Sequence, residues 1–143
     1  MAYLNSTQQV VKEMGDFLAK TKWTFFATLT TPYPITLNQG RRFMENYHSY
    51  LLELGLKPMI YWVIEPFSDK ENGCHIHALI KIDVFEDIKT LLEALKKAWR
   101  RISNGSVVSM KNTQIDPYIE EKGANYYVAK YICSENVEYD VFV

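Results

Sequence analysis

The segment Met59–Ile82, MIYWVIEPFSDKENGCHIHALIKI, indicates the fold class of this chain. Its two outer parts, Met59–Glu65 and Cys74–Ile82, are rich in β-branched and aromatic residues, which favour strands. Between them, Ser68–Gly73 is polar and is predicted to be a turn. Two strands joined by a short polar turn predict an antiparallel hairpin, and the other elements are placed around it.

Helices and further strands flank this hairpin. Four segments are predicted to be helices: Thr7–Lys20, Leu37–Leu54, Val84–Arg100 and Ala124–Cys133. Three of them follow a capping box, in which two side chains satisfy each other's free amides: Ser6 with Gln9, Thr36 with Gln39, and Asp83 with Glu86. Trp23–Thr30 is predicted to be a strand, as is a segment from Ser106 that ends at Met110 or extends to Ile115. The tail Val137–Val143 is either a short edge strand or disordered.

The order of these elements predicts an α+β fold with a central antiparallel sheet flanked by helices. Strand, helix, hairpin, helix and strand in succession is the split βαβ pattern of ferredoxin-like and RRM-like domains. A length of 143 residues fits one domain, residues 1–143, and 48% hydrophobic residues are enough to form its core.

Composition argues against several classes of protein. Lys and Arg number 16 against 17 Asp and Glu, and a net charge of −1 argues against a protein that coats nucleic acid without specificity. Two cysteines do not make a disulfide framework or a four-cysteine zinc site, and they fit a reducing compartment. The longest apolar run, Met59–Ile64, is too short to cross a membrane, and the N-terminus lacks the features of a signal peptide. We therefore expect a soluble, cytoplasmic protein without a membrane partner.

A histidine pair suggests a metal site in the predicted hairpin. His75 and His77 are two residues apart in a strand, so both project from one face, while Cys74 and Ile76 project from the other. Glu65 ends the neighbouring strand and can lie next to the histidines. Two imidazoles and a carboxylate suit Mg²⁺, Mn²⁺ or Zn²⁺, and three ligands leave positions open for chemistry. The alternative is two polar side chains on an exposed sheet face.

A group of tyrosines marks the last predicted helix. Tyr127, Lys130 and Tyr131 stand at positions i, i+3 and i+4 and share one face, whereas Tyr126 is rotated away. A tyrosine hydroxyl can form a covalent intermediate, and a nearby cation would help it to ionise. The alternative is an amphipathic helix whose tyrosines contribute to the core.

Three motifs in order resemble the HUH endonucleases, in particular the rolling-circle replication initiators (Rep proteins) of plasmids and viruses. The motifs cover most of the chain: WTFFATLT at Trp23–Thr30, GCHIHALI at Gly73–Ile80, and YVAKYI at Tyr127–Ile132. The resemblance implies a central five-stranded antiparallel sheet. It also implies a site-specific endonuclease and strand-transferase that acts on single-stranded DNA.

The resemblance further implies a role for each site residue. His75, His77 and Glu65 bind Mn²⁺ or Mg²⁺, which polarises the scissile phosphate. Tyr127 attacks the phosphate and leaves a 5′-phosphotyrosine and a free 3′-hydroxyl, which primes replication and later rejoins the strand. Lys130 assists by its charge. Tyr131 is either a second nucleophile or a residue that packs in the core or stacks on the substrate.

Two other functions remain open. A small HUH transposase shares the chemistry and the motif order, although its tyrosine helix more often carries Gln where Lys130 stands. A non-catalytic RRM-like module would use its tyrosines to stack on bases. The chain has no phosphate-binding loop for ATP, so a replication initiator of this kind would need a separate host helicase and polymerase as partners, besides the single-stranded DNA or hairpin of its origin.

Basic residues on two of the predicted helices are candidate contacts to DNA phosphates. They are Arg41, Arg42, Lys96, Lys97, Arg100 and Arg101. The alternative is that they are solvated, and that those near a helix C-terminus complement the helix dipole.

Overall fold

A computed structural model describes residues 6–31, 33–66, 73–83, 87–103, 113–119 and 137–143 of the chain. These contain three helices and five strands, in the following order: α1 Ser6–Ala19, β1 Phe25–Leu29, α2 Leu37–Glu53, β2 Met59–Pro66, β3 Cys74–Lys81, α3 Ile88–Ser103, β4 Gln114–Pro117 and β5 Glu138–Phe142. No helix among the described residues is both long enough and apolar enough to cross a membrane.

The strands form one five-stranded sheet in the order β4-β1-β3-β2-β5, and every neighbouring pair is antiparallel. Strand β3 lies between β1 and β2, so the unit β1–α2–β2 is a split βαβ. Strand β1 in turn lies between β3 and β4, so β3–α3–β4 is a second split unit interleaved with the first. The predicted α+β class with its central antiparallel sheet is therefore confirmed.

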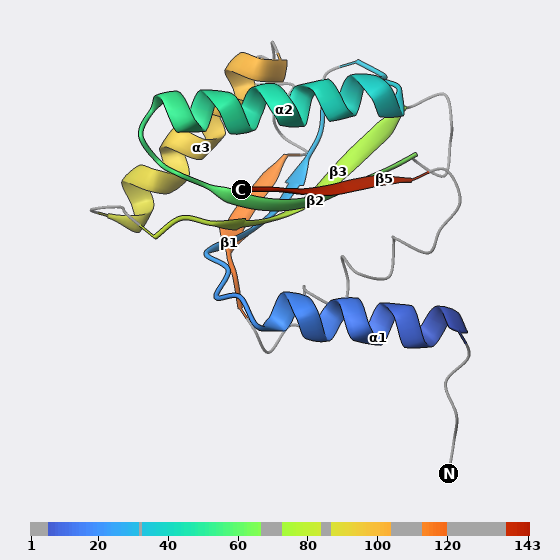
Figure 1. Cartoon of the computed structure of the whole chain (residues 1–143). Coiled ribbons are helices and arrows are strands. Elements are labelled where there is room, and N and C mark those ends of the chain that lie inside the picture. The colour runs from blue at the N-terminus through green and yellow to red at the C-terminus, as the bar shows by residue number, and fades with distance from the viewer. Residues whose placement is uncertain (1–5, 32, 67–72, 84–86, 104–112, 120–136) are drawn as a thin grey trace.

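Each face of the sheet is covered by its own layer. Helices α2 and α3 lie on one face and α1 lies on the other (Figure 1). The alternation of strand residues explains this arrangement, because Phe25, Ala27 and Leu29 are buried on the α2–α3 face, whereas Phe26 is packed on the α1 face.

The larger core lies between the sheet and the α2–α3 layer. It contains Trp62 and Trp99, together with Tyr47, whose hydroxyl donates a hydrogen bond to the Leu95 carbonyl at 3.0 Å. A smaller cluster on the other face joins Leu18 of α1 to Trp23 and to residues of β2 and β3. Counting only the described residues, both faces are shielded over part of their area, and fewer buried side chains lie on the α1 face than on the other.

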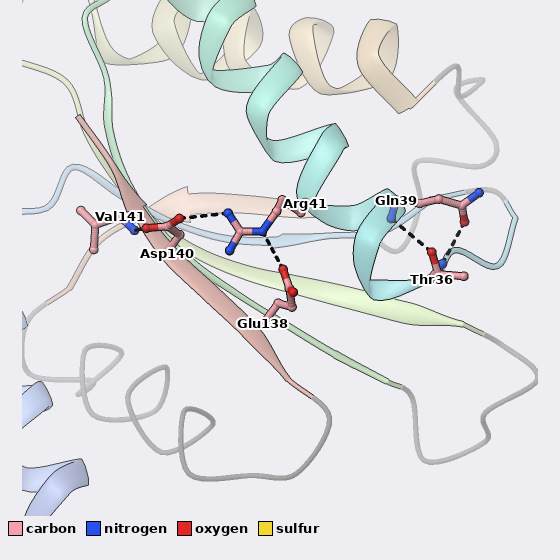
Figure 2. Close-up of polar contacts among 6 residues, drawn as sticks. All are labelled: Thr36, Gln39, Arg41, Glu138, Asp140 and Val141. Carbon is pink, nitrogen blue, oxygen red and sulfur yellow. Dashed lines mark hydrogen bonds and ion pairs between the residues drawn. The ribbon is translucent and has the colours of Figure 1, made fainter.

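The start of α2 follows the sequence prediction, while the starts of α1 and α3 differ. Thr36 and Gln39 form the predicted capping box (Figure 2). The predicted cap of α3 at Asp83 is wrong, because the Asp87 carboxylate accepts hydrogen bonds from the Lys89 and Thr90 amides and α3 begins at Ile88. Ser6 is likewise the first residue of α1 and does not precede it.

Two described strands, β4 and β5, bear on the predictions made for the C-terminal part of the chain. The strand expected from Ser106 to Met110 falls outside the described residues, and β4 is found further along, at Gln114–Pro117. The edge-strand alternative for the tail is confirmed by β5, which supplies the fifth strand. The predicted helix Ala124–Cys133 lies outside the described residues.

Candidate metal centre

The central strands place the three predicted metal ligands side by side. In the ladder between β2 and β3, Glu65 is paired directly with His75, and Val63 with His77. The intervening Ile76 is buried in the larger core beneath α2 and α3. His75, His77 and Glu65 therefore project together from the α1 face of the sheet, as the strand period requires.

The side-chain geometry brings both imidazoles to one carboxylate oxygen. His75 Nε2 lies 2.7 Å from Glu65 Oε1, and His77 Nε2 lies 3.6 Å from the same oxygen. The two imidazole rings are nearly perpendicular, with centroids 4.8 Å apart. The side chains of His75 and Glu65 are 15% and 17% exposed and that of His77 is 7% exposed, so the group is largely enclosed but reachable from solvent.

These three residues fit a divalent metal ion. Their candidate ligand atoms all lie within 4.8 Å of one another. Ligands bound to one ion at 2.0–2.2 Å stand about 3 Å apart, so the two Nε2–Oε1 distances need only small adjustments. Nitrogen and carboxylate donors together suit first-row divalent metals, and three protein ligands leave coordination positions open. The arrangement could hold a metal and present it to a substrate.

Two residues of β1 lie beside His77. Thr28 is paired with His77 across the β1–β3 ladder, and its Oγ1 lies 3.5 Å from His77 Nδ1. The ring of Phe26 is parallel to the His77 imidazole, with centroids 6.3 Å apart. Sequence reasoning assigned neither residue to the site, although both lie in the first quoted motif and on the face opposite the larger core. Knowledge of the β1–β3 register would have identified them.

A tyrosine on the same face is unsuited to nucleophilic chemistry. Tyr61 lies on β2, two residues before Val63, and its side chain is fully buried. Burial raises the pKa of Tyr61 above its ordinary value, with a smaller contribution from Tyr139. Its hydroxyl has no hydrogen-bond partner within the described part of the chain. Tyr61 is therefore a core residue.

The predicted nucleophile and its neighbours, Tyr127, Lys130 and Tyr131, lie outside the described residues. The flanking residues on each side are described. Tyr118 and Val137 both pack against the smaller cluster, on the face that carries the metal ligands. The segment with the tyrosine motif is thus bounded at both ends by residues on this face.

Arg41, a predicted DNA contact, makes interactions within the protein. Its guanidinium forms ion pairs with Glu138 at 2.7 Å and Asp140 at 3.0 Å (Figure 2). It also lies 5.0 Å from the centre of the Trp62 ring. These acidic partners raise the pKa of Arg41, mainly through the hydrogen bond with Glu138. Arg41 therefore links α2 to the edge strand β5.

The other predicted DNA contacts are not near the metal ligands. Arg42 is exposed on α2. The remaining four lie on α3, where three are exposed and Arg100 is half-buried: Lys96, Lys97, Arg100 and Arg101. Because α2 and α3 cover the opposite face of the sheet, the structure does not bring these residues together with the histidine pair.

Comparison with protein-family models, with curated proteins and with solved structures gives no match for this chain. Its function has to be inferred from its residues and their geometry.

Proposed function

We propose that this protein is a Mn²⁺- or Mg²⁺-dependent, site-specific endonuclease and strand-transferase for single-stranded DNA. In this proposal it nicks a replication origin through a covalent phosphotyrosine and so initiates rolling-circle replication. The observation that carries the proposal is the group of His75, His77 and Glu65 on one face of a five-stranded antiparallel sheet. This is the arrangement expected from the resemblance to HUH endonucleases.

The histidine pair and Glu65 would hold the cation in this reaction. A bound divalent cation supplies Lewis-acid polarisation of a phosphate oxygen. The rigid β2–β3 ladder supports the proposal, because ligands fixed by paired strands are already oriented before a metal or a substrate binds. Ile76 and Ala78 alternate with the two histidines along β3 and are buried in the larger core. Their burial therefore keeps both imidazoles on the opposite face of the sheet.

Tyr127 is the proposed nucleophile. Its oxygen attacks the scissile phosphorus, the bond from phosphorus to the 3′-oxygen breaks, and that oxygen leaves with a proton as a free 3′-hydroxyl. In the reverse direction, a 3′-hydroxyl attacks the phosphotyrosine and restores the strand. Lys130 would offset negative charge on the phosphate. The positions of Tyr118 and Val137 support this assignment, because these described residues, one before and one after the segment, both pack on the face that carries the candidate metal ligands.

A covalent adduct provides the test. We would incubate the protein with labelled single-stranded origin oligonucleotides and Mn²⁺, and detect adducts on denaturing gels. An adduct is expected with Mn²⁺ and is expected to disappear with EDTA. Tyr127→Phe should abolish it, and Tyr126→Phe is the matched control. An adduct formed at full rate by Tyr127→Phe would show that the nucleophile is wrong, and Tyr131→Phe then tests the second tyrosine.

Metal binding is tested separately, without DNA. Calorimetric titration with Mn²⁺ should give one site, which Glu65→Gln and His77→Ala remove. His48→Gln is the control, because His48 is the third histidine and hydrogen-bonds the Pro58 carbonyl instead. Unchanged Mn²⁺ affinity in Glu65→Gln would refute the metal centre. DNA binding that needs no metal and gives no adduct would favour the RRM-like module.

A further inference from the structure

Helix α3 carries a concentrated positive charge on its solvent side. Between Ile88 and Ser103 it holds five basic residues and a single acidic one, Glu93. We define the α3 basic face as the following residues: Lys89, Lys96, Lys97, Arg100 and Arg101. The opposite side of the helix contains Leu91, Leu95 and Trp99 and is buried in the larger core. The charges are therefore held on a helix that is anchored to the sheet.

Within the described part of the chain, the charge of the α3 basic face is not offset by ion pairs. Among the described residues, no ion pair engages any of its five side chains, whereas Arg41 on the neighbouring helix has two. The rest of the chain holds 11 Lys and Arg against 16 Asp and Glu, so the net charge of −1 conceals a strong separation of charge. Such a field attracts a polyanion to one side of the molecule.

The geometry of the face fits the backbone of a duplex. Lys96 and Arg100 are one helical turn apart, about 6 Å along the axis, and Lys89 lies about two turns before Lys96 on the same side, with Glu93 between them. The Arg101 guanidinium lies 5.1 Å from the centre of the Tyr50 ring, which orients it at the edge of this row. A row of fixed cations can follow phosphates without reading bases.

Single-stranded DNA fits this face less well. Proteins that hold single strands stack successive bases on exposed aromatic rings. The exposed aromatic side chains of the described residues are Phe17, Tyr33 and Tyr139. Of these, only Tyr33 reaches α3, where its hydroxyl donates a hydrogen bond to the Ser103 carbonyl at 3.0 Å. One ring at the end of the helix does not provide a stacking platform.

We infer that the α3 basic face binds the phosphate backbone of a DNA duplex, on the side of the sheet opposite the metal centre. The choice of DNA rests on the proposed function. The protein would then hold two forms of DNA at once, with a duplex arm on α3 and a single strand at the histidine pair. Binding to the duplex is independent of metal and of sequence, and it weakens steeply with salt.

The test measures duplex affinity in EDTA, so that it depends on neither metal nor cleavage. A labelled 20-base-pair duplex is titrated with protein at several salt concentrations, and binding is followed by fluorescence anisotropy. The variant is Lys96→Gln/Lys97→Gln, which removes two exposed charges. The control is Lys20→Gln/Lys22→Gln, which removes two exposed charges just after the end of α1. Thermal unfolding of both variants verifies that each is folded.

We expect the Lys96→Gln/Lys97→Gln variant to lose about two units of the slope of log K against log salt, and about 60-fold in duplex affinity at about 0.1 M salt. The control should lose much less. Equal losses in the two variants would overturn the inference, as would an equal loss of single-strand and duplex affinity in the first variant. If duplex binding depends on Lys96 and Lys97 but the wild-type protein forms no adduct, the inference about α3 is supported and the proposed function is refuted. The two experiments therefore test the two proposals independently.

Discussion

Replacing Arg41 with methionine should loosen the edge strand β5. Arg41 joins α2 to two carboxylates of β5, Glu138 and Asp140 (Figure 2). Its guanidinium also lies over the ring of Trp62. Within the described residues, β5 pairs with β2 alone, so the Arg41 contacts add to that one ladder and to the packing of Phe142 in holding the strand. Methionine keeps an apolar stem beside Trp62 and removes the charge and its hydrogen bonds.

The expected loss of stability follows from the exposure of these groups. The side chains are 30–45% exposed, so each ion pair contributes about 0.2–1 kcal/mol. The cation–π contact adds about 0.5–1 kcal/mol. Together these contacts contribute about 1–3 kcal/mol to the free energy of unfolding. Each kcal/mol shifts the Tm of a chain of this size by about 3–4 °C.

The assay compares thermal unfolding of Arg41→Met with that of Arg42→Met, because Arg42 is the adjacent, exposed arginine. A double-mutant cycle with Asp140→Asn isolates one ion pair and should give a favourable coupling. Hydrogen exchange of residues 138–142 should become faster in Arg41→Met. If both arginine variants have equal stability and equal exchange, and only DNA affinity falls in Arg41→Met, then Arg41 is a DNA contact and the structural argument is refuted.

Three further predictions concern single side chains. Thr28→Val should weaken Mn²⁺ affinity about 10-fold or more in calorimetry, because the residue supports the metal ligand His77, and Thr28→Ser should restore it. The pKa of Asp87 is lowered, mainly by the hydrogen bond from the Thr90 hydroxyl, so its contribution to stability is present above pH 3.8 and is lost as the pH falls through the lowered pKa. The Tm of Asp87→Asn should thus be below wild type at neutral pH and approach it in acid. Gly73→Ala should cost more in chemical denaturation than Gly55→Ala, because both have positive φ but only at Gly73 would a Cβ meet backbone atoms, at 2.7 Å.

The hairpin and the grouping of its candidate metal ligands could be predicted because the evidence for them is local. Alternation along Cys74–Lys81 fixes which side chains share a face, and a short turn leaves few choices of register. The pairing of Glu65 with His75 follows from these two facts. The same alternation correctly excluded Cys74, which is buried on the other face.

The features that could not be predicted depend on distant contacts or on weak patterns. Strand β4 has one buried side chain, Ile115, so it lacks the alternation that marks a half-buried strand. Asp83 and Asp87 are both good caps by sequence, and only the hydrogen bonds to Asp87 decide between them. The partners of Arg41 lie 97 and 99 residues away, and its sequence neighbours give no sign of them.

The separation of charge also changes what the overall composition implies for binding. A net charge of −1 argued against a protein that coats nucleic acid, and that argument holds for the molecule as a whole. It does not hold for α3, whose five basic side chains are free of ion pairs among the described residues. The acidic remainder of the chain would repel DNA that approaches in other orientations. Attraction on one side and repulsion elsewhere would orient a duplex on α3, while the three metal ligands on the opposite face stay available to a single strand.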